Sequence, residues 1–202
     1  GDVYADPIKN GFTQIWDDFL KSAKDMVAIA RKKAAKSHDH KKRLDRTDIR
    51  FRLRWLDIPG LSGYKYGLGG TSAQSAFYIC ALCMIRAYLK QDDAFLLDSS
   101  AAISATIEEK QNGEILLGEV VGKSAKMDAA YRKGLRVVVV AKESEATAQK
   151  DLENATLRYK AINPGYEATT EVRGAATIEE AIEILTALVS DVHTYLTRLE
   201  EE

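Results

Sequence analysis

Apolar and polar residues follow three successive patterns in the first part of the chain. Between residues 8 and 35 apolar side chains recur at helical spacing, which predicts one amphipathic helix. The polar and basic stretch 37–48 is typical of a linker. From 49 to 55 apolar residues alternate with arginines, as in a strand with one buried face, and Pro59-Gly60 should end this strand.

The middle of the chain combines a helical pattern with a hairpin pattern. The run 73–89 is apolar on most sides, so we expect a helix near the centre of the domain. The strand-like runs 101–110 and 114–121 flank Asn112-Gly113. This pair predicts a hairpin closed by a type I′ turn, which needs positive φ at both central residues.

Short helical and extended runs alternate after the hairpin. A helix over 123–133 should stop at Gly134. The valine run within 136–141 is typical of a fully buried strand. We expect a helix over 143–152 and a weak strand over 157–162.

The last part of the chain predicts a turn and a long helix. Pro164-Gly165 should form the turn, and the helix should run from Thr177 to about Glu200, with Thr177 as N-cap and Glu180 as its capping-box partner. The order after the linker is β-α-β-β-α-β-α-β-α. This order predicts an α/β (α+β) fold, in which helices pack on a mixed sheet with an antiparallel hairpin. We divide the chain into an N-terminal helix with a basic linker (1–47) and a main domain (48–202).

Composition narrows the class of protein but not its function. The chain has 202 residues, of which 46% are hydrophobic, and a net charge of −1, as in ordinary globular domains. No apolar run approaches the roughly 20 residues that span a bilayer, and no signal-peptide pattern opens the sequence. Two cysteines do not make a disulfide framework. We therefore expect a cytoplasmic protein with no membrane partner.

The first candidate for chemistry is Ser72, which ends a glycine-rich loop and opens the predicted helix. Its small neighbours Gly70, Thr71 and Ala73 would let a substrate backbone approach. Unpaired N–H groups at a helix N-terminus can stabilise a developing oxyanion, so these three neighbours are candidate substrate-binding or oxyanion-binding residues. The alternative is that Ser72 is only a helix N-cap.

The second candidate is Lys126, in the first turn of the helix after the hairpin. A lysine can act as a general base when burial lowers its pKa from about 10.4 toward neutrality. Lys126 lies between Ala125 and Met127, in a small and apolar setting, whereas we expect Lys123 to be solvated. The alternative is that both lysines are ordinary surface residues.

Both candidates lie in segments that resemble a known family. The run GEVVGKSAKMDAAYRKGL, from Gly118 to Leu135, resembles the lysine-bearing segment of Lon proteolytic domains. Gly70-Thr71-Ser72-Ala73 resembles the nucleophile motif of that family. The resemblance covers roughly residues 48–190, in the order that the family has, and it aligns the catalytic lysine with Lys126.

The resemblance implies a serine endopeptidase with a Ser72–Lys126 dyad, a protein or peptide substrate and assembly as a homo-oligomer. It implies no metal and no cofactor in this chain, with ATP used only by a module elsewhere. The chain departs from the family pattern at Thr71 and Gln74, and Ser104 or Thr106 must replace a threonine of the first hairpin strand. These departures leave an alternative, a catalytically silent Lon-like scaffold or regulatory domain of a larger multidomain protein.

Other motifs allow rival interpretations. The segment from Gly118 to Ser124 is similar to a phosphate-binding loop but has one residue too few between its glycines. Cys80 and Cys83 lie in an apolar helix, where we expect core thiols rather than a zinc or redox site.

The basic segment between the N-terminal helix and the first strand also has two interpretations. From Arg31 to Arg54 there are eleven basic and three acidic residues. These basic side chains could bind the phosphates of a nucleic acid. We favour the alternative that they form a solvated face or a contact between subunits. We expect His38-Asp39-His40, within this segment, to be solvated rather than to bind a metal.

Overall fold

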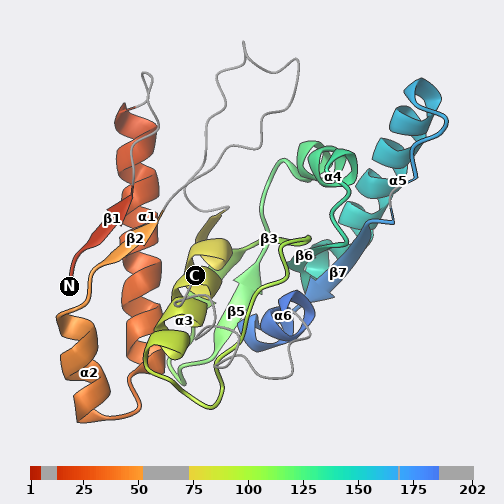
Figure 1. Cartoon of the computed structure of the whole chain (residues 1–202). Coiled ribbons are helices and arrows are strands. Elements are labelled where there is room, and N and C mark those ends of the chain that lie inside the picture. The colour runs from red at the N-terminus through yellow and green to blue at the C-terminus, as the bar shows by residue number, and fades with distance from the viewer. Residues whose placement is uncertain (6–12, 52–72, 168, 187–202) are drawn as a thin grey trace, which may run out of the picture.

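The fold is mixed α/β, as the sequence predicts. The computed structural model describes residues 1–5, 13–51, 73–167 and 169–186 (Figure 1). The helices in this part of the chain are α1 (Thr13–Ala34), α2 (His38–Asp45), α3 (Gln74–Tyr88), α4 (Lys123–Arg132), α5 (Glu145–Ile162) and α6 (Ile178–Leu185), with a short 3-10 helix, η2 (Lys142–Ser144), before α5. The strands are β1 (Val3–Ala5), β2 (Ile49–Phe51), β3 (Ala101–Ser104), β4 (Thr106–Glu109), β5 (Ile115–Gly118), β6 (Val137–Ala141) and β7 (Glu171–Ala175).

A parallel sheet in the order β3-β6-β7 forms the centre of the molecule. The valine run forms β6, whose residues are all buried, so the prediction of a buried strand is confirmed. Successive side chains of a strand point to opposite faces. Val138 and Val140 pack with α4 and α5 in one hydrophobic cluster, whereas Val139 and Ala141 belong to the larger cluster with α1, α3 and α6. Helices therefore cover both faces of the sheet.

The N-terminal helix packs against the central helix of the domain. Ala23, Val27 and Ala30 of α1 are fully buried and belong to the same cluster as Phe77 and Leu82 of α3. In Figure 1, α1 runs alongside α3, on the side away from α4 and α5. The predicted amphipathic helix and the predicted central helix are both confirmed within the described residues.

The predicted hairpin is confirmed, but its turn differs from the expected type. β4 pairs with β5 in antiparallel register, with Thr106 opposite Gly118. Gly113 has φ 81°, whereas Asn112 has no positive φ, so the type I′ prediction was wrong. The Gly113 N–H donates to the Lys110 carbonyl at 2.9 Å. A three-residue loop with a left-handed glycine closes the hairpin instead.

The first predicted hairpin strand divides into two strands at Ala105. β3 pairs with β6 in the parallel sheet, whereas β4 pairs with β5 in the hairpin. We call Ala105, where β3 ends and β4 begins, the joint. Ser75 of α3 fixes the joint, because its Oγ donates to the Ala105 carbonyl at 2.8 Å and accepts from the Ala105 N–H at 3.3 Å. Both residues are fully buried. The chain therefore passes from one sheet to the other at a point fixed by a helix side chain.

Residues 37–48 were predicted to form a linker, but they contain the helix α2, so this prediction was wrong. The Ser37 side chain caps α2 by accepting from the His40 N–H at 3.1 Å. Leu44 is the buried residue of α2, so the segment carries too few apolar residues to show a helical pattern. The next strand is confirmed as far as β2, which pairs with β1 in parallel, and the rest of the predicted strand lies outside the described residues. The division at residue 47 stays a prediction.

Two predictions for the C-terminal part were also wrong. The weak strand at 157–162 is the second half of α5, which buries Ala148, Leu152 and Ala155 at helical spacing. β7 instead supplies the third strand of the parallel sheet. α6 has the predicted Thr177 cap but ends at Leu185, because Thr186 is extended and forms a bridge with Leu97. Residues from 187 on lie outside the described part.

The outer edge of β7 carries a side-chain hydrogen bond. The Gly174 N–H donates to Glu145 Oε1 at 2.8 Å, and Lys142 pairs with the same carboxylate. A Cβ on Gly174 would lie 2.9 Å from the Glu145 Cβ, so the glycine is needed for this close approach.

Candidate functional site

The candidate site lies where β3 of the parallel sheet ends. Ligands of open parallel sheets commonly bind beyond the carboxyl ends of the strands. β3 ends at Ser104, and Lys126 of α4 donates from Nζ to Ser104 Oγ at 3.0 Å. The same amine donates to the Val121 carbonyl at 3.2 Å. Lys126 thus bridges the end of β3 and the loop that follows β5.

The local sequence explains why Lys126 reaches this position. Gly122 has φ 75°, a left-handed conformation that turns the chain from the β5 loop into α4. α4 buries Met127, Ala130 and Tyr131 against the sheet. Lys126 precedes these residues in the first turn, so it lies at the margin of the core and is only partly exposed.

The surroundings of Lys126 make its charged form less favourable than that of an exposed lysine. Desolvation lowers the pKa of this amine from its ordinary value. The first turn of α4 also disfavours a positive charge, because the helix dipole is positive at that end. Among the described residues no carboxylate pairs with Lys126. A partly buried lysine without a counter-ion has the properties of a general base.

Lys123 is less exposed than expected and forms an ion pair. Its side chain is only 13% exposed and pairs with Glu119, so the expectation of a solvated lysine was wrong. Ser144 Oγ donates to the same Glu119 carboxylate at 3.2 Å. Hydrogen bonding and charge from Lys123 lower the pKa of Glu119. Within the described residues, Lys123 therefore has a counter-ion and Lys126 has none.

The predicted nucleophile lies outside the described residues. The same holds for Gly70 and Thr71, whereas Ala73 is described and occupies the N-cap position of α3, with no side-chain cap.

The first turn of α3 is hydrogen-bonded to the segment that follows Ser104. Gln74 Oε1 accepts from the Ile107 N–H at 3.2 Å, and Ser75 holds Ala105. The helix that begins after Ser72 therefore starts next to the strand end that Lys126 reaches.

Ser104 is the described hydroxyl that contacts the lysine. The resemblance in the sequence leaves both Ser104 and Thr106 as candidates for one expected hydroxyl of this strand. Of the two, Ser104 is buried and accepts the hydrogen bond from Lys126. Thr106 instead packs on the hairpin, where its Oγ1 would lie 2.5 Å from a Cβ on Gly118.

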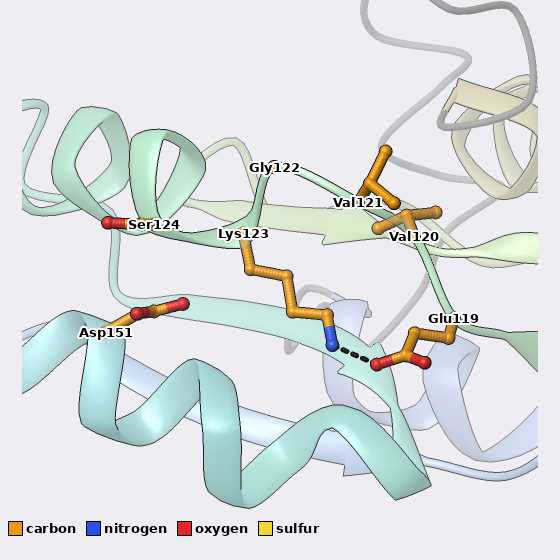
Figure 2. Close-up of a pocket in the computed structure, with 7 residues that line it drawn as sticks. All are labelled: Glu119, Val120, Val121, Gly122, Lys123, Ser124 and Asp151. Atoms are coloured by element: carbon orange, nitrogen blue, oxygen red, sulfur yellow. Dashed lines mark hydrogen bonds and ion pairs between the residues drawn. The ribbon is translucent and has the colours of Figure 1, made fainter.

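A hollow of about 540 Å³ lies beside the same loop, between the start of α4 and α5. Its lining includes Val121, Lys123 and Asp151 (Figure 2). The Val121 side chain is 91% exposed, although its carbonyl contacts Lys126. One lining residue of the hollow, Val121, therefore also contacts the lysine amine, although Lys126 itself does not line the hollow.

The phosphate-loop interpretation finds little support in this geometry. The glycine-containing loop does connect a strand with a helix, but that strand is β5 of the antiparallel pair. Lys123, the lysine that would contact phosphate, already forms an ion pair with Glu119. A phosphate would have to compete with this carboxylate and would be repelled by it.

Cys83 and His40 make local contacts, whereas Cys80 is exposed, so the expectation of core thiols was wrong for Cys80. Cys83 donates to the Phe95 carbonyl at 2.9 Å, and burial raises the pKa of its thiol to about 11. His40 lies in the first turn of α2, 3.3 Å from the Gln91 amide. Within the described ranges no group of three or more His, Cys, Asp or Glu side chains gathers as a metal site would require.

Several basic residues of the segment from Arg31 to Arg54 make contacts within the chain. Lys32 pairs with Glu109 and Lys36 with Asp93. Arg31 donates to the Thr47 carbonyl.

Comparison with models of known protein families gives no match for this chain, and comparison with curated proteins gives none either. Among the described helices, none has the length and apolar character needed to cross a bilayer.

Proposed function

We propose that the chain is a Lon-like serine endopeptidase domain in which Ser72 is the nucleophile and Lys126 the general base. One observation carries the proposal. The half-buried amine of Lys126 lies 3.0 Å from Ser104, and the next residue, Ala105, is bonded to the first turn of the helix that follows Ser72. The helix that directly follows the predicted nucleophile motif and the helix that carries Lys126 thus contact neighbouring residues at the same strand end.

The chemistry of Lys126 supports the role of base. A neutral amine can accept the proton of Ser72 as the hydroxyl attacks a peptide carbonyl. The ammonium then gives this proton to the leaving amine, and a covalent ester remains on the serine. Water attacks the ester with the same lysine as base, which restores the free serine.

The opening of α3 supports a role in oxyanion binding. Ala73 has no side chain that could cap the helix, so within the described part of the chain no N-cap side chain accepts from its first N–H groups. Such groups can donate to the oxygen of a tetrahedral intermediate and are worth several kcal/mol in serine peptidases. We assign this role to the backbone at Ala73, with Gly70 and Thr71 as substrate-contacting neighbours.

The direct test is cleavage of casein by the whole chain and its variants. Ser72→Ala and Lys126→Ala should each reduce the rate by at least about a thousandfold, because the two groups act as a unit. Lys150→Ala, an exposed lysine of α5, is the matched control and should keep full activity. Cleavage that persists in Ser72→Ala would falsify the dyad. If the unaltered chain cuts no peptide, the silent scaffold becomes the better account.

A further inference from the structure

The hollow beside the β5–α4 loop extends to α5 and shares one residue, Val121, with the contacts of the general base. Val121 accepts a hydrogen bond from Lys126 through its carbonyl and presents its side chain to solvent at the rim. Asp151 of α5 lies at the other end of the lining. The hollow is open to solvent, and its volume of about 540 Å³ can accommodate a long side chain.

The charges that line the hollow do not cancel. In Figure 2 the Lys123 amine turns toward Glu119, with which it pairs, while Asp151 points from α5 toward the loop. In the part of the chain that the structure describes, no cation pairs with Asp151. The hollow thus combines one unmatched carboxylate with the apolar surface of Val120 and Val121.

We propose that this hollow is the subsite for a lysine or arginine side chain of the peptide substrate, with Asp151 as the specificity-determining residue. The inference rests on the proposed peptidase function. A basic side chain matches both parts of the lining, because its alkyl stem covers apolar surface and its head pairs with a carboxylate. An acidic side chain would be repelled by Asp151, and an apolar one would leave that carboxylate partly desolvated without a partner.

The location of the subsite limits the distance, along the substrate peptide, between the basic residue and the cleaved bond. The rim at Val121 is adjacent to the general base, and an extended peptide advances about 3.3 Å per residue. The basic residue should therefore occur at one fixed position within a few residues of the cleaved bond.

Binding to the Ser72→Ala chain tests the subsite without the need for cleavage. The probes are two fluorescent alanine-rich peptides that differ at one position, lysine in one and norleucine in the other, so that only the charged head differs. The lysine peptide should bind about fivefold more tightly, as expected for a partly exposed ion pair, and added salt should reduce the difference. The additional change Asp151→Asn should remove the preference.

The control is Glu153→Gln, which removes another carboxylate of α5 and should keep the preference. The inference is overturned if the two peptides bind equally, if neither binds, or if the preference survives Asp151→Asn.

Mass spectrometry of casein fragments separates this inference from the proposed function. The unaltered chain should enrich lysine and arginine at one position near its cut sites, and Asp151→Asn should lose the enrichment while it still cleaves. Cleavage without such enrichment overturns the subsite and leaves the peptidase. Absence of all cleavage, with the binding preference intact, overturns the peptidase and leaves the basic-residue site.

Discussion

At the scale of single residues, the most informative contact is the pair of hydrogen bonds from Lys126. They hold the amine between Ser104 and the Val121 carbonyl, at the margin of the core. The sequence could distinguish Lys126 from Lys123 by its small, apolar neighbours and by family resemblance. It could not reveal that Glu119 neutralises Lys123, since an ion pair depends on where the loop places both side chains.

The pH dependence of cleavage should follow the protonation of Lys126. Burial lowers the pKa of this lysine below its usual value of 10.5, and only the neutral amine can accept a proton. The value of kcat/KM should therefore rise with pH and reach a plateau below pH 10.5. A rate profile over the alkaline range checks this. A rate that falls as the pH rises through this range would contradict the assignment of Lys126 as base.

Removal of the Ser104 hydroxyl should impair catalysis without loss of the fold. Ser104→Ala deletes one acceptor of Lys126, and a hydrogen bond of this kind contributes about 0.5–1.5 kcal/mol, so kcat/KM should fall by about twofold to tenfold. Ser104→Thr keeps the hydroxyl and should restore most of the rate. Ser100→Ala, next to the other end of β3, is the control, and an equal loss there would argue against a specific role for Ser104.

At the scale of elements, the joint at Ala105 brings the site together. The sequence predicts one strand from 101 to 110, because β3 and β4 have similar extended patterns. Ser75 distinguishes them by bonding to both backbone groups of Ala105. A side chain more than twenty residues away along the sequence cannot be recognised from local pattern, and for this reason the extra strand was missed.

Ser75→Ala should destabilise the domain and disturb the site. The change leaves a buried N–H and a buried carbonyl of Ala105 without their partner, which costs about 1–3 kcal/mol of unfolding free energy. Urea denaturation followed by circular dichroism measures this loss. Thr177→Ala removes the α6 cap far from the joint and should cost about 1 kcal/mol without a change in kcat. A neutral effect of Ser75→Ala would show that the joint does not need this side chain.

At the scale of the whole molecule, β6 links two hydrophobic clusters. Val139 packs toward α1, α3 and α6, and Val140 packs toward α4 and α5. Because the strand belongs to both clusters, loss of either should unfold the same cooperative unit.

Leu82→Ala tests this coupling in the larger cluster. Leu82 is 1% exposed, so its truncation should cost about 2–5 kcal/mol and lower the midpoint of a single transition. Leu152→Ala in the other cluster should shift the same transition. Leu157→Ala, at a position 69% exposed, should change stability by less than about 0.5 kcal/mol. Two separate transitions in either core variant would contradict a common unit.

The sequence predicted most of the helices and strands where the local pattern of apolar residues is strong. The elements that it missed depend on contacts that the local pattern does not show. The buried valine strand and α3 were predicted because each has a continuous apolar run, and α4 was predicted with Gly134 as its stop signal. β1, α2 and β7 were missed, because each is short and depends on a distant partner or a cap. In the candidate site, Lys126 was predicted and Ser104 was left as one of two choices.

The hydrogen bond between Glu145 and Gly174 bears on how copies of the chain can meet. β7 is the edge of the parallel sheet, and a free edge invites an incoming strand from another molecule. Glu145 already occupies an outward N–H of this edge, and its pairing with Lys142 helps to keep it ionised. Glu145→Ala should therefore increase light scattering of concentrated samples on warming, whereas Glu143→Ala should not. In the native chain a carboxylate thus occupies a donor of the β7 edge, which disfavours the addition of a strand from another copy there.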